Sequence, residues 1–134
     1  MAGRAGMVLD TGECLRFVSA REAGWVVPSE AVVPVPGLVL PAVGLVLTED
    51  RVATALRVGT VDAGHMVVCE TEGGWVALMG ARVAATGVFC EADDGAGVVH
   101  RGQVARELDV RGLTLDVEAA IWRAAWPTGE ERLG

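Results

Sequence analysis

Short valine-rich stretches, separated by glycine and proline, constrain the fold of this chain more than any other feature. The 134 residues include 23 Val, one Ile, 18 Gly and 5 Pro. Val prefers pleated, half-buried backbone, and Gly and Pro supply turns. Roughly eight to ten short strands follow one another at spacings of about ten residues. The pattern predicts an all-β protein, a barrel or a sandwich, with one C-terminal helix.

The strands are identified by alternation of apolar and polar residues or by short apolar runs. The clearest hairpin joins 65–71 to 75–79 through Gly73 and Gly74, whose backbone freedom suits a tight turn. We expect Val68 and Val76, or their immediate neighbours, to face the core. Further strands are predicted at 13–20, 25–28, 42–47, 51–58, 82–90 and within 98–110.

Two helical segments are expected. Ser29 can cap a single helical turn over 29–32. Asp116 can cap a longer helix whose body runs from Val117 to Trp126, before a proline. Trp122 and Trp126 lie four residues apart on this helix, so they are expected to be either core residues or a docking edge for a partner.

The length predicts one domain. We place it at residues 13–126, between a flexible N-terminus at 1–12 and a polar tail at 127–134. The first twelve residues lack the apolar stretch of a secretory signal. Three widely spaced cysteines, an odd number, favour buried free thiols and a cytoplasmic location.

The net charge and the prolines argue against nucleic acid and membrane lipid as partners. A net charge of −7 disfavours binding to nucleic acid. Residues 31–48 carry no charge, but three prolines, Pro34, Pro36 and Pro41, argue against a membrane helix. We therefore expect no nucleic-acid partner and no direct membrane insertion.

Chemistry-bearing residues are few, and no catalytic, cofactor-binding or metal site is predicted. The chain has two His and two Ser, and no general base lies beside a nucleophile in a familiar spacing. His65 and Cys69 share a strand face but would lie about 13 Å apart, too far to hold one ion. We therefore do not expect an enzyme.

Read in order, several short motifs resemble the CheW-like domain, the chemotaxis coupling family. Residues 15–18 and 25–32 are similar to the family's first hairpin and the proline that follows it. The Pro36-Gly37 pair, residues 43–46, and the strand 51–56 are similar to its next segments. Residues 84–88 resemble its Val-x-Gly-Val segment, and 112–117 resemble the Leu-Leu-Asp before its closing helix.

The departures from the family pattern concentrate in one region. Where the family usually has Asn-Leu-Arg-Gly, this chain has Leu47-Thr48-Glu49-Asp50, and Arg57 replaces a usual Asp. Both changes reverse a charge. The family's receptor-docking surface draws on this region, so reversed charge there can change the partner.

The resemblance implies two small, SH3-like, five-stranded β-barrels packed as one domain, with a groove between them and no enzymatic activity. It implies an adaptor of a bacterial chemotaxis or chemosensory-like pathway that links a CheA-type histidine kinase to receptors or to a changed protein partner. The alternative is a small all-β binding or regulatory subunit, SH3-like or OB-like, unrelated to chemotaxis. The candidate partner-binding residues are Glu49, Asp50, Arg51, Arg57, Trp122 and Trp126.

Overall fold

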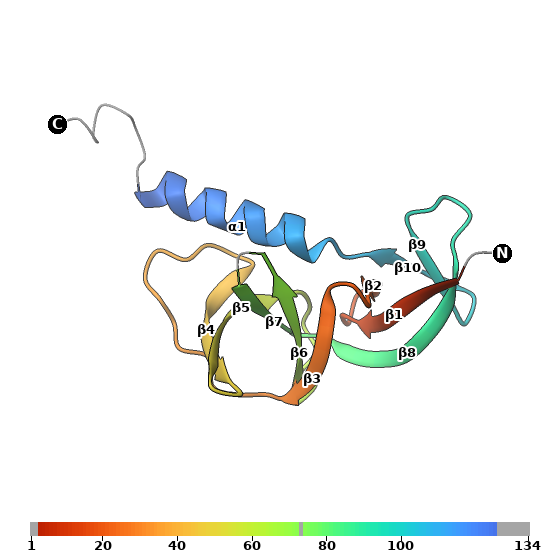
Figure 1. The fold of residues 1–134 in the computed structure, drawn as a ribbon, viewed down its shortest axis with the longest axis horizontal. Helices are drawn as coiled ribbons and strands as arrows, with labels where there is room; N and C mark the ends of the chain where they lie inside the picture. The colour runs from red at the N-terminus through yellow and green to blue at the C-terminus, as the bar shows by residue number, and fades with distance from the viewer. Residues whose placement is uncertain (1–2, 73, 126–134) are drawn as a thin grey trace.

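The computed structural model describes residues 3–72 and 74–125, which form ten strands and one helix (Figure 1). In chain order these are β1 (Gly3–Asp10), β2 (Leu15–Ser19), β3 (Ala23–Pro28), β4 (Ala42–Thr48), β5 (Arg51–Arg57), β6 (His65–Thr71), β7 (Gly74–Met79), β8 (Arg82–Glu91), β9 (Gly97–His100), β10 (Gln103–Glu107) and α1 (Val110–Ala125). The expected all-β class with one C-terminal helix is confirmed.

The first unit is a closed barrel in the order β1-β2-β10-β9-β8. Val8, Phe17, Val98 and Ala105 fill its interior. The prediction of a flexible segment at residues 1–12 is wrong for 3–10, because β1 pairs with both β2 and β8 and so closes the barrel.

The second unit is a five-stranded sheet in the order β3-β6-β7-β5-β4. The sheet curves around its own cluster of buried side chains (Figure 1). The central hairpin β6–β7 is confirmed, with Val68 and Val76 buried; Gly73 lies outside the described residues. Of the two barrels expected, one is a closed barrel and the other is this sheet, with β3 and β4 at its edges.

An extended segment precedes β4 where a helical turn was predicted. Residues 29–32 are not helical, so that prediction is wrong. The Val33 N–H donates to the Leu45 carbonyl at 2.8 Å, and the Leu45 N–H donates back at 2.9 Å. Pro34 has no N–H to donate to a helix hydrogen bond, and it disfavours a helical conformation at the residue before it. Residues 29–41, called the strap below, therefore pass beside β4 without forming a helix, with Val33 bonded to its edge.

One apolar layer joins the two units and the helix. Leu9 and Val18 of the barrel, Leu56 and Leu78 of the sheet, and Val117 of α1 belong to the same buried cluster. The outer face of the second sheet therefore packs against both the barrel and the helix.

The cysteines differ in their environments. Cys69 belongs to the layer between the units, and its burial raises its pKa to about 12. Cys14 and Cys90 are exposed free thiols, so the prediction that each cysteine is buried is wrong for these two. Both lie on the surface of the barrel unit. Cys14 comes just before β2, and Cys90 belongs to β8.

Helix α1 begins at Val110 and not after Asp116, as the sequence suggested. The Asp109 carboxylate accepts the N–H of Gly112 at 2.9 Å, and the Glu22 carboxylate accepts the N–H of Arg111 at 3.2 Å. These two carboxylates satisfy N–H groups that a helix start leaves free. None of the helices within residues 3–72 and 74–125 has the length and apolar character needed to cross a membrane.

Candidate partner-binding groove

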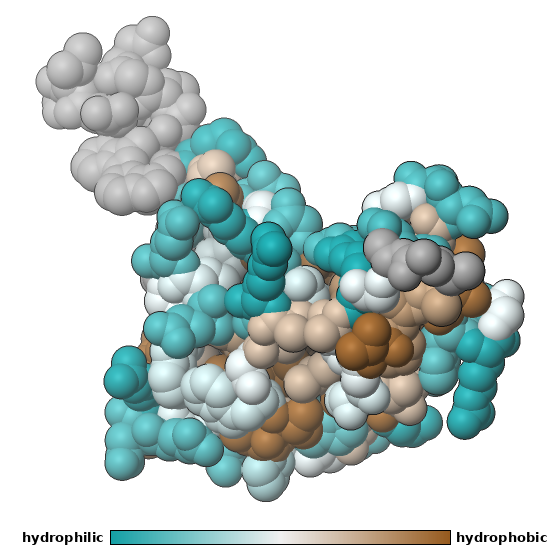
Figure 2. Space-filling model, turned by 45° about the vertical axis from the view of Figure 1, so that its right-hand side comes forward, coloured by the Kyte–Doolittle hydropathy of each residue, from teal (hydrophilic) through white to brown (hydrophobic). Residues whose placement is uncertain are grey.

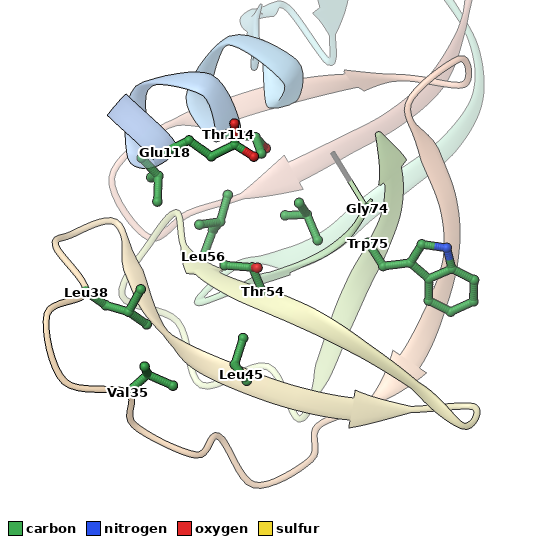
Figure 3. Close-up of a pocket in the computed structure, with 11 residues that line it drawn as sticks. Val35, Leu38, Leu45, Thr54, Leu56, Gly74, Trp75, Thr114 and Glu118 are labelled. Carbon is green, nitrogen blue, oxygen red and sulfur yellow. The ribbon is translucent and has the colours of Figure 1, made fainter. Parts of the chain in front are cut away.

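A mostly apolar groove lies where α1 crosses the outer face of the second sheet (Figure 3). Its cavity measures about 240 Å³. The sheet provides one side, and α1 and the strap before β4 provide the others. The lining residues are Val35, Leu38, Leu45, Thr54, Leu56, Gly74, Trp75, Val76, Thr114, Val117 and Glu118.

The strand pattern explains why this surface is apolar. Leu45 and Thr54 are opposite each other in the β4–β5 ladder, and Thr54 is beside Val76 in the β5–β7 ladder. Cross-strand neighbours share a face, so these three side chains form one row on the outer face of the sheet. Leu56 and Val76 are fully covered, whereas Leu45 and Thr54 are half-buried.

The helix contributes two of the polar lining residues, Thr114 and Glu118, and the sheet contributes Thr54. The Thr114 hydroxyl donates to the Val110 carbonyl at 2.8 Å, so it is already engaged. Among the described residues that line the groove, Glu118 is the only one with an ionisable side chain. The groove is therefore suited to cover apolar groups, and the same lining offers no acid–base pair.

The apolar face continues from the groove to the tip of the β4–β5 hairpin. Leu47 and Val52 face each other two residues farther along the same face, and they are 64% and 61% exposed. Glu49 and Asp50 form the turn between them, both exposed and both at positive φ, 49° and 65°. An acidic turn thus flanks an uncovered apolar pair.

Arg51 contacts one member of an aromatic pair, Trp75. Its guanidinium lies 4.6 Å from the centre of the Trp75 ring, which in turn meets Trp25 edge-on at 4.7 Å. In Figure 3 the Trp75 indole points away from the other labelled side chains of the groove. Arg51 therefore stabilises this end of the sheet, which limits its freedom to meet a partner.

The structure separates the predicted site residues. Glu49, Asp50 and Arg51 lie together at one end of β5, and Arg57 lies at its other end, about 20 Å away by strand geometry. Arg57 lines a different cavity, together with His65 and Asp62. Trp122 belongs to α1, but its side chain is outside what the structure describes, and Trp126 lies beyond residue 125.

None of the residues that line the groove was among the site residues predicted from the sequence. The signal was present in 42–47, where every residue is apolar although one face of an edge strand usually meets water. Leu45 and Leu47 are the outward residues of that run.

The described part of the chain offers no evident centre for a metal ion. Within residues 3–72 and 74–125, no group of three or more His, Cys, Asp or Glu side chains is placed to hold one ion. The His65 Nε2 atom accepts the Val83 N–H at 3.1 Å, so this nitrogen has a structural role between β6 and β8.

Comparisons with known proteins find a similarity of fold to solved structures. No family model and no curated protein matches the chain. Among solved structures, the scaffolding protein TtCheW from Thermoanaerobacter tengcongensis superposes with a TM-score of 0.66 at 10% sequence identity. The match covers 84% of this chain and 92% of that one. The chain therefore has the fold of a CheW scaffolding protein.

Proposed function

We propose that this protein is a non-catalytic adaptor in a bacterial chemosensory pathway, acting in the cytoplasm. In this role it links a CheA-type histidine kinase to chemoreceptors or to a protein that has replaced them. The shared fold with a CheW scaffolding protein supports the class of protein. The groove beside α1 is the observation that carries the proposal.

The size and lining of the groove favour a protein partner over a small molecule. Its 240 Å³ is below the roughly 300–1,000 Å³ usual for small-molecule sites. Leu47 and Val52 follow its lining residues Leu45 and Thr54 along the same face of the sheet. Exposed apolar side chains that adjoin a pocket are typical of surfaces covered by another protein. The groove can hold one anchoring side chain of a partner protein. Leu47 and Val52 can form the apolar contacts around that anchor.

The acidic turn supports a changed partner. Glu49 and Asp50 stand where the family resemblance expects Arg and Gly, so an acidic surface replaces a basic one. A partner that complements the usual basic turn would meet like charge here, whereas a basic surface would be attracted. The partner of this turn is therefore expected to carry Lys or Arg.

Binding of the wild-type protein to the kinase and to receptor tips of the same organism tests the proposal. Val52→Asp puts a charge on the exposed apolar face and should weaken binding about tenfold or more. Val104→Asp, on a half-exposed valine of the barrel, is the matched control and should bind as wild type does. If the wild type binds neither class of protein, the chemosensory role is wrong and the unrelated β-subunit takes its place.

The charge reversal has its own test. Glu49→Arg combined with Asp50→Gly restores the family pattern at these two positions and should strengthen binding to receptor tips. Surface plasmon resonance at two salt concentrations measures the change, which should shrink at high salt. If wild type already binds receptor tips as tightly as an ordinary family member, the acidity does not exclude them.

The two tryptophans stay candidates for a second contact. If Trp122 and Trp126 form a docking edge, alanine at each should leave the melting temperature unchanged and weaken partner binding. If they are core residues, the same variants should lower the melting temperature and leave binding otherwise intact. Calorimetry and a binding assay on the same samples distinguish the two, and no change in either would contradict both.

A further inference from the structure

Strand β8 has a long edge without a strand partner. It pairs with β1 from Arg82 to Cys90, but on its other side it meets β9 only at Cys90 and Glu91. Within residues 3–72 and 74–125, no strand pairs with the second edge of β8 between Val83 and Phe89. The barrel is closed, yet this stretch of it offers a free edge (Figure 1).

The ladder fixes which backbone groups point outward. The Ala5 carbonyl accepts the Ala20 N–H at 2.9 Å, so the backbone of Ala5 faces β2. Ala5 is opposite Val88, and the groups of such a non-hydrogen-bonded pair point away from each other. The N–H and C=O of Val88 therefore face the free edge, and strand alternation puts those of Thr86 there too.

A second hydrogen bond gives the same result for which residues of β8 direct their backbone groups toward the free edge. The Ala92 N–H donates to the Gly97 carbonyl at 2.8 Å, so the backbone of Ala92 faces β9. Counting back in twos along β8 reaches Val88 and Thr86 on the same side. The unpaired N–H and C=O groups thus recur at every second residue along this edge. An extended backbone of a partner has hydrogen-bonding groups at the same spacing.

The free edge is bounded at both ends. The Val83 N–H is taken by His65, and the turn at Arg101–Gly102 ends β9 beside Val88. Residues 84–88 remain, a window of about 17 Å. The occupant must therefore be a short extended segment, since a second copy of the ten-residue β8 would run past both boundaries.

The side chains around the window add selectivity. Val88 is 73% exposed and lies beside Ala5 on the outer face, and apolar side chains reach the surface on the barrel side in Figure 2. Residues 84–88 carry no charge. Exposed Arg82 and Arg101 flank the window at its two ends.

We propose that the β8 edge at 84–88 is a docking site for a short extended segment of a protein partner, which adds to the barrel as a strand. The segment carries an apolar residue next to Val88 and an acidic residue toward each flanking arginine. Backbone hydrogen bonds provide the binding, and the side chains provide the selection. This site is separate from the groove beside α1, so either can fail without the other.

Synthetic peptides test the docking site. The heptapeptide ETVTVTE should bind saturably and should slow amide exchange at Thr86 and Val88, measured by NMR. KTVTVTK should bind about tenfold more weakly because it meets two arginines. Absence of saturable binding by ETVTVTE at millimolar concentration, or equal binding of the two peptides, would overturn the proposal.

N-methylated peptides separate strand addition from side-chain docking. N-methyl groups on the three threonines block one edge of the peptide, and on the two valines the other edge. One of these two peptides should lose binding and the other should keep it. If both keep it or both lose it, the segment does not bind through its backbone.

Protein variants complete the test. Val88→Glu should abolish binding of ETVTVTE, and Val104→Glu, on another exposed valine of the barrel, should leave it unchanged. Sedimentation of the protein without peptide should give a monomer. A dimer that Val88→Glu dissociates would show that a second copy covers this edge, and would overturn the proposal.

Discussion

The indole N–H of Trp25 is buried and has no hydrogen-bond acceptor among the described residues. Leaving such a donor unsatisfied costs about 1–3 kcal/mol. The ring packs edge-on against Trp75, and the Arg51 guanidinium lies over the Trp75 ring. Packing against Trp75 thus opposes the polar penalty at Trp25.

Substitution by phenylalanine separates these contributions. Trp25→Phe removes the unsatisfied donor together with part of the ring, so the two effects should nearly cancel in the free energy of unfolding. Trp75→Phe removes part of a ring and weakens the contact with Arg51, and should cost about 1–2 kcal/mol more. Urea denaturation of both variants measures the difference. A larger loss for Trp25→Phe would show that its N–H is satisfied in solution.

Glu22 is a second residue under conflicting influences. Burial raises its pKa above the ordinary 4.5, although N–H groups of Arg111 and Val110 at the start of α1 oppose the shift. A raised carboxyl pKa means that the folded state binds the proton more tightly than the unfolded state. Its contribution to stability therefore grows as pH falls through the folded pKa toward 4.5.

Glu22→Gln removes this dependence on pH. The stability of the variant relative to wild type should be greatest near pH 7, where the wild-type carboxylate is charged. It should decline as the pH falls toward 4.5, because only wild type gains a proton there. Chemical denaturation of both proteins at several pH values measures the difference in their free energies of unfolding. A relative stability that is constant with pH would contradict the assigned shift.

At the scale of elements, the β4–β5 hairpin combines a tight turn with residues that suit it poorly. Both turn residues have positive φ, which glycine and asparagine tolerate better than glutamate or aspartate. Glu49→Asn with Asp50→Gly should therefore raise the free energy of unfolding by about 1 kcal/mol. A thermal melt measures the gain. Glu70→Gln with Asp62→Asn, at two exposed positions without positive φ, removes the same number of negative charges and should give no such gain.

The start of α1 shows where sequence patterns misled. The prediction took Asp116 as the capping residue, with the helix body from Val117 onward. In the structure Gly112 lies in the first turn, and a Cβ there would meet the Asp109 carboxylate that caps the helix. Glycine at this position therefore leaves room for the capping carboxylate of Asp109. Helix propensity alone does not reveal such a requirement.

Strand β1 was missed for a related reason. Residues 1–12 were predicted to be a flexible N-terminus, although Met7, Val8 and Leu9 form a short apolar run. Gly6 is required because a Cβ would meet the Val18 carbonyl and the Phe17 ring, both on β2. Strands with clear alternation, such as β5, and the hairpin of β6 and β7 were predicted correctly, because their pattern depends on local sequence alone.

At the scale of the whole molecule, the groove could not be predicted because it depends on three distant segments. Val35, Thr54 and Val117 come together only when α1 crosses the sheet and the strap follows β4. The acidic turn was predicted from the sequence because four consecutive residues carry it. Arg57 was grouped with that turn although the length of β5 separates them.

Removal of the first ten residues tests how the barrel is closed. Strand β1 pairs with β2 and β8, and Leu9 reaches the layer between the units. A chain that starts at Thr11 should therefore lose cooperative unfolding and the dispersed NMR signals of the barrel. A control that lacks only residues 1–2 should be as stable as wild type. A stable, cooperative chain without β1 would contradict its role.

The order of the strands also determines when each unit can fold. Strands β3 to β7 are contiguous in sequence, whereas the barrel needs β1 and β2 from one end of the chain and β8 to β10 from the other. Contacts between residues so far apart in sequence close large loops and form slowly. During synthesis the second sheet can therefore form while the barrel is still incomplete. Its outer face, with Leu56, Val67 and Leu78, stays uncovered until the last third of the chain has emerged, which exposes the nascent protein to aggregation at that stage.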